Sequence, residues 1–163
     1  MRPFPAHTLN PRVKFVWRIT AFLSVLIPYI LFMASMTPLY FTVYAGDVAF
    51  IFMMLATVTA VVLFILMVIV MPAIRFRYWR YEVGEHELDI ARGFIWRKRF
   101  IIPFVRVQNT DTRQGPLLRL FGLASVTVST AADTHEIPGL SFEEADALRD
   151  LIAEQARLAQ EDV

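Results

Sequence analysis

Two long apolar runs without a charged side chain constrain this chain of 163 residues more than any other feature. They cover residues 19–36 and 48–71, and neither contains Asp, Glu, Lys, Arg or His. As helices they would extend about 27 Å and about 36 Å, against a bilayer core of about 30 Å. Neither run shows the polar face expected of a helix in a soluble hairpin, and the first is too long for the apolar part of a signal peptide. The runs therefore predict a two-helix transmembrane hairpin over residues 19–71.

The cations that flank the two runs predict the orientation of this hairpin. Cytoplasmic flanks of membrane helices carry an excess of Lys and Arg. The connecting loop over residues 37–47 has neither, so we expect both termini to be cytoplasmic. No ionisable residue lies within the runs, which disfavours a channel, a pump or a proton relay. Cations precede the first run and follow the second: Arg2, Arg12, Lys14 and Arg18, then Arg75, Arg77 and Arg80.

The rest of the chain is charged throughout and long enough for one small domain. We expect a cytoplasmic N-terminal tail over residues 1–18 and a cytoplasmic domain over residues 75–160. Residues 75–119 carry ten Arg or Lys against five acids, whereas residues 133–163 carry two against nine. The net charge of +1 therefore conceals a basic part beside the membrane and an acidic tail.

Alternation of apolar and polar residues predicts antiparallel strands, followed by one helix. The clearest strand covers residues 124–130, and we expect its hydroxyl side chains to face solvent. Ser141 and Glu144 form a capping box that begins an amphipathic helix over residues 141–160. The expected fold class is a membrane α-helical hairpin plus an α+β domain, a bent antiparallel sheet or partial barrel capped by a C-terminal helix. The remaining predicted strands cover residues 78–83, 87–90, 94–96, 99–104, 105–112 and 135–140.

No group of residues predicts a catalytic or metal site, and none indicates a cofactor. The chain has no cysteine, its three histidines are separated, and it lacks phosphate-loop, nucleophile-elbow and zinc-protease motifs. The one carboxylate–imidazole cluster, residues 85–87 with Asp89, has no standard ligand spacing, so we interpret it as a solvated turn. No nucleic-acid-binding motif is present. The sequence favours a protein that is not an enzyme, and an enzyme completed by assembly is the weaker alternative.

A basic cluster, Arg97-Lys98-Arg99, is the strongest candidate binding site, with Phe94 and Trp96 beside it. Cations near anionic headgroups contribute about 1 kcal/mol each to membrane binding, and aromatic rings favour the interface. These five residues are therefore candidates for contact with lipid headgroups or with a partner. The alternative is an ordinary solvated stretch next to a membrane anchor.

Four segments, in this order and spacing, resemble the bacterial PH-like (pleckstrin-homology-like) domain of the YdbS/YdbT group, a membrane-flanked domain. The resemblance implies a strongly bent antiparallel sheet capped by a C-terminal helix, without catalytic residues. It also implies a membrane partner, such as a larger relative with repeated copies of the domain. In PH domains that bind phosphoinositides the cations cluster at the first hairpin. Here that turn, residues 84–87, is acidic, which disfavours specific phosphoinositide recognition. The four segments cover residues 102–108, 115–124, 126–131 and 137–140.

Together these features predict a membrane-anchored, non-enzymatic PH-like module at the bacterial inner membrane. The leading hypothesis is that it binds a protein or peptide partner, such as a PH-like paralogue, as a subunit of a membrane complex. The alternative is a component that senses anionic lipid or envelope stress. Homo-oligomerisation is a further open alternative.

Overall fold

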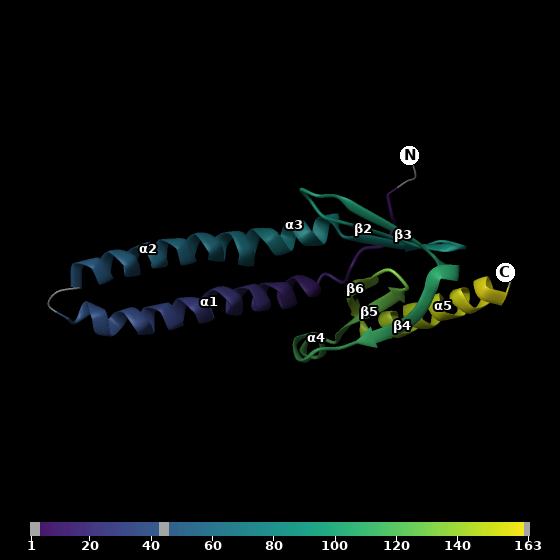
Figure 1. The fold of residues 1–163 in the computed structure, drawn as a ribbon. Helices are drawn as coiled ribbons and strands as arrows, with labels where there is room; N and C mark the ends of the chain where they lie inside the picture. The colour runs from purple at the N-terminus through teal and green to yellow at the C-terminus, as the bar shows by residue number, and fades with distance from the viewer. Residues whose placement is uncertain (1–3, 43–45, 162–163) are drawn as a thin grey trace. The chain divides into compact units, whose positions relative to one another are not determined.

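A computed structural model describes residues 4–42 and 46–161, which form two compact units (Figure 1). One unit contains residues 17–73. The other combines the N-terminal segment up to Val16 with everything from Ile74 onward.

The first unit consists of two long apolar helices. Helix α1 covers Val13–Tyr40, and a second helical stretch consists of α2 (Gly46–Phe64), a π-helical segment η1 (Ile65–Val70) and α3 (Met71–Tyr78). Both stretches are long and apolar enough to cross a membrane, and few of their apolar side chains are buried, as expected of lipid-facing helices. The hydroxyls of Tyr29 and Thr57 lie 3.2 Å apart and join the helices by a hydrogen bond.

The second unit contains two three-stranded antiparallel sheets and a C-terminal helix. Strands β1 (Arg80–Val83), β2 (Glu87–Arg92) and β3 (Lys98–Pro103) form the first sheet in that order. A single 3-10 turn, η2 (Phe104–Arg106), leads into the second sheet, whose order is β4-β5-β6. The strand-then-helix architecture predicted from the sequence is confirmed. The remaining elements are β4 (Val107–Arg113), α4 (Pro116–Leu120), β5 (Leu123–Thr130), β6 (Thr134–Ser141) and α5 (Phe142–Glu161).

Helix α5 packs on the second sheet through a buried apolar stripe (Figure 1). The predicted capping box is confirmed: the Ser141 backbone N–H donates to Glu144 Oε2 at 3.0 Å, and the Glu144 N–H donates to Ser141 Oγ at 3.2 Å. These bonds satisfy two donors of the first turn. The buried stripe consists of Ala145, Leu148, Ile152 and Ala156, opposite Val126, Val128, Ile137 and Leu140.

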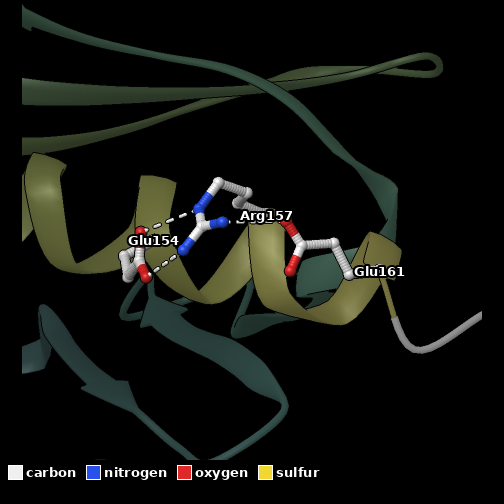
Figure 2. A network of polar contacts seen from close by, with 3 residues as sticks. All are labelled: Glu154, Arg157 and Glu161. Atoms are coloured by element: carbon white, nitrogen blue, oxygen red, sulfur yellow. Dashed lines mark hydrogen bonds and ion pairs between the residues drawn. The ribbon is translucent and has the colours of Figure 1, made fainter.

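The acidic outer face of α5 carries its own counter-charges. Arg157 donates to Glu154 Oε1 at 2.6 Å and to Glu161 Oε1 at 2.8 Å, one helical turn away on either side (Figure 2). Arg149 is paired with Asp146, three residues before it, and with the adjacent Asp150. The acidic charge of this helix is therefore partly countered by its own two arginines.

Several local predictions were wrong. Residues 94–96 form a loop, because β2 ends at Arg92 and the next residue, Gly93, has a φ of +100° that breaks the extended backbone. Val105 lies in the 3-10 turn rather than in a strand. The side chains of Ser125 and Thr127 are buried, because β5 is the central strand of its sheet and is covered on both faces.

The N-terminal segment is integrated into the same unit as the sheets. His7 forms an antiparallel bridge to Tyr81 of β1, with N–H to carbonyl distances of 3.0 and 3.1 Å. The side chains of Leu9 and Val13 are 1% and 0% exposed. The sequence predicts a cytoplasmic N-terminal tail over residues 1–18, and in the structure residues 4–16 pack into the same unit as the sheets.

Gly139 explains how this segment approaches β6 so closely. Its backbone has a φ of +64°, and a Cβ atom added there would collide with the Val13 side chain. The Gly139 carbonyl also accepts a hydrogen bond from the Asn10 N–H at 3.0 Å. Glycine is the residue that satisfies both the positive φ and the close contact.

Candidate functional site

The loop between β2 and β3, residues 93–97, presents three consecutive large apolar side chains to solvent. Phe94, Ile95 and Trp96 are 50%, 74% and 82% exposed. The turn is tight, since a Cβ on Gly93 would overlap the backbone of Trp96. We call residues 94–96 the apolar tip. An apolar tip of this size on a soluble surface indicates a contact with a membrane or a partner.

The apolar tip packs against the last residue of the second apolar helix. The ring of Phe94 lies 5.1 Å from the ring of Tyr78, and the Arg97 guanidinium lies 5.8 Å from the same ring. Tyr78 is the last residue of α3, seven residues after Met71, where the apolar run ends. At 1.5 Å per residue this is about 10 Å of helix. The contact with Tyr78 therefore holds the loop close to the point at which the chain would leave a membrane.

Arg99 differs from its neighbours because it is bound to a buried carboxylate. Its Nε lies 3.0 Å from both oxygens of Asp89, and its Nη2 lies 2.5 Å from Oδ2. Asp89 is only 8% exposed. The hydrogen bond to Asp89 raises the pKa of Arg99 above its ordinary value. The charge of Arg99 is thus already countered, and its role is to hold β3 against β2.

A groove of about 460 Å³ lies beside the apolar tip and is lined by cations. The sequence cluster contributes Arg97, Lys98 and Arg99, while Phe94 and Trp96 flank the groove on the loop. The groove has further cationic members that sequence reasoning missed. The complete lining consists of Phe4, Arg77, Tyr78, Arg80, Ala91, Arg92, Gly93, Arg97, Lys98 and Arg99.

The three additional cations come from three different elements. Arg92 ends β2 and lies directly opposite Lys98 in the antiparallel register. Pairing the two strands around Gly93 as a β-hairpin would have predicted this neighbour from the sequence. Arg77 belongs to α3, and Arg80 begins β1. Arg80 donates to the Trp79 carbonyl at 2.9 Å and so helps to cap α3. The packing of α3 against the β2–β3 hairpin is a tertiary contact, and no local sequence signal predicts it.

The groove can bind an anion, and among the described residues its lining provides no carboxylate or imidazole for general acid–base catalysis. Within the described ranges, no three His, Cys, Asp or Glu side chains are grouped to bind a metal. The cluster at residues 85–87 lies at the other end of β2. Asp89 does not join that cluster, because its carboxylate is paired with Arg99.

Comparison with known proteins places this geometry in a family. The model of the bacterial PH domain family matches residues 19–156, which include the apolar helices and both sheets. The chain belongs to this bacterial PH domain family, as its resemblance predicts. No solved structure matches.

A particular relative is described as a transmembrane protein. The UPF0699 transmembrane protein YdbS of Bacillus subtilis (strain 168) is 52% identical over 99 residues, which are 61% of this chain and 62% of that relative. The match thus spans less than two thirds of the relative's length. With two helices of spanning length and a transmembrane relative, this chain is a membrane-associated PH-like protein.

Proposed function

We propose that this chain is a membrane-anchored, non-enzymatic interaction module of the bacterial inner membrane, with its PH-like domain and both termini in the cytoplasm. The cations that flank the two apolar runs support this orientation. Among the described residues the groove lining is cationic and contains no carboxylate or imidazole, which supports a binding role rather than a catalytic one.

One observation carries the choice of ligand: the apolar tip and the cationic groove adjoin each other, and the tip contacts Tyr78 at the end of the membrane helix. Aromatic side chains beside cations are typical of protein surfaces that lie in the headgroup layer. The geometry therefore favours contact with an anionic membrane surface, the alternative hypothesis from the sequence, over a soluble partner.

Photo-crosslinking in native bacterial membranes tests this function. A photoreactive amino acid replaces Ile95, which is 74% exposed in the tip, and a matched variant carries it at His86, at the opposite end of β2. We expect phospholipid adducts from position 95 and few from position 86, measured by mass spectrometry. A single protein adduct from position 95 in place of lipid would contradict the proposal.

A protein or peptide partner, such as a PH-like paralogue, is the second proposal, and a separate observation favours it. β3 is the last strand of its sheet, so its outer edge has no strand partner within residues 4–42 and 46–161. A groove of about 600 Å³ lies beside its end, lined by Ile101, Val105 and Ala131 among others. Such edges accept an extended peptide as an added strand. Co-purification in mild detergent tests this; loss of the co-purifying protein in an Ile101→Pro variant would support it.

A further inference from the structure

The lining of the basic groove points to a phosphate site, and we infer that this groove binds the phosphate of an anionic phospholipid headgroup. This inference rests on the proposed function, in which the apolar tip of the β2–β3 hairpin meets the membrane surface. It goes further by naming the ligand group and the residues that bind it.

The charges of the groove are only partly countered by the protein. Asp89 pairs with Arg99, and Arg80 donates to the backbone carbonyls of Phe76 in α3 and of Trp79. Arg77 and Lys98 form no ion pair with any residue that the structure describes, and Arg92 and Arg97 contact the rings of Phe100 and Tyr78. The uncompensated cations of the groove are therefore Arg77, Arg92, Arg97 and Lys98.

Arg92 and Lys98 indicate most directly that an anion is bound. They are directly opposite each other in the register of β2 and β3. Side chains in such positions have Cβ atoms about 5 Å apart, and like charges there destabilise a sheet. No carboxylate lines the groove to relieve this repulsion. A phosphate between the two side chains would relieve it with charge-assisted hydrogen bonds.

The size and position of the groove favour a lipid headgroup over a free ion. Small-molecule sites measure about 300–1,000 Å³, and the groove volume of about 460 Å³ falls in this range. A lone phosphate would fill a small part of it. Phe4 and Tyr78 add apolar wall, and the exposed apolar tip lies next to the groove, so apolar contact is available beside the phosphate site.

Titration of the full-length chain in neutral detergent micelles tests the inference. A dye on a Cys introduced at His86 reports binding, since the chain has no other cysteine. The titrants are phosphatidylglycerol, phosphatidylcholine and, at constant ionic strength, inorganic phosphate. We expect phosphatidylglycerol to bind at least tenfold more tightly than phosphatidylcholine, and millimolar inorganic phosphate to compete with it.

Two double variants with equal loss of charge separate a site from general electrostatics. Arg92→Gln with Lys98→Gln should weaken phosphatidylglycerol binding at least tenfold. Arg113→Gln with Arg119→Gln, which lie exposed outside the groove, should weaken it less than twofold. In lipid-free micelles the Arg92/Lys98 variant should unfold at the same temperature as the wild type or a higher one, because the repulsion is removed.

Four results would overturn the inference. Equal weakening by the two double variants would indicate a diffuse electrostatic effect. Binding of inorganic phosphate without preference for phosphatidylglycerol would exclude a lipid as the source of the phosphate. Displacement of lipid by an acidic peptide at equal concentration would point to a protein ligand. Lipid adducts at position 95 together with unchanged binding by the Arg92/Lys98 variant would refute the phosphate site alone, leaving the proposed membrane contact intact.

Discussion

Gly139 shows how strongly a single residue determines the packing of the N-terminal segment. Its φ is positive and a Cβ atom would overlap Val13. We expect Gly139→Ala to lower the free energy of unfolding by about 2–5 kcal/mol, the sum of left-handed strain and overpacking. Gly122→Ala is the matched control, because Gly122 has the same φ of +64° with no atom near its Cβ position. Thermal unfolding in detergent measures both, and a Gly139→Ala variant as stable as Gly122→Ala would contradict the packing described.

Tyr81 makes a prediction about alkaline pH. Burial raises the pKa of its phenol, and the negative charge of Glu144 raises it further. The folded state thus favours the neutral phenol, so this contribution to stability is complete below the ordinary pKa of about 10 and is lost as the pH rises through the folded-state value. The thermal midpoint should fall above pH 10, less steeply in Tyr81→Phe. An identical fall in that variant would show that another group is responsible.

At the scale of single residues the candidate site was partly predictable. Phe94, Trp96, Arg97 and Lys98 are consecutive or nearly so, and local adjacency was enough to find them. Arg99 could not be assigned correctly, because its pairing with Asp89 depends on the strand register. Three further cations lie on elements that meet only in the folded unit, so no spacing rule in the sequence brings them together. They are Arg77, Arg80 and Arg92.

At the scale of elements, the N-terminal segment yields the clearest prediction. Leu9 is 1% exposed, whereas the neighbouring Thr8 is exposed. Leu9→Ala should cost about 2–5 kcal/mol of folding free energy, and Thr8→Ala should change it by less than about 0.5 kcal/mol. Trypsin cleavage after Arg12 should accelerate in the Leu9 variant alone. Equal cleavage of both variants would mean that the segment is not held by Leu9.

Elements with a strong local signal were predicted, and those determined by distant contacts were not. Helix α5 combines a capping box with an apolar stripe, and β5 alternates over seven residues. Residues 94–96 have high β-propensity but follow Gly93, whose positive φ turns the chain. The short helix α4 was missed, although Gly115-Pro116 is a typical start signal. Pairing of His7 with Tyr81 joins residues more than seventy positions apart, which periodicity does not reveal.

At the scale of the whole molecule, residues on both sides of the helical hairpin form one folded unit. They must therefore lie on the same side of the membrane, which requires an even number of crossings. Single cysteines test this, because the chain has none of its own. Thr8→Cys and Ala132→Cys should react with an impermeant maleimide only from the cytoplasmic face, and Thr42→Cys only from the opposite face. Labelling of Thr8 and Ala132 from opposite faces would refute the hairpin.

The central claim is that the PH-like domain meets the membrane through the apolar tip. Its most direct test is the depth of a spin label at Ile95→Cys in phosphatidylglycerol nanodiscs, compared with a label at His86→Cys. The six residues of β2 place these two positions about 20 Å apart. We expect oxygen, which concentrates in the bilayer, to relax the label at position 95 more than a water-soluble nickel complex does, with the reverse at position 86. Equal access of the nickel complex to both positions would contradict it.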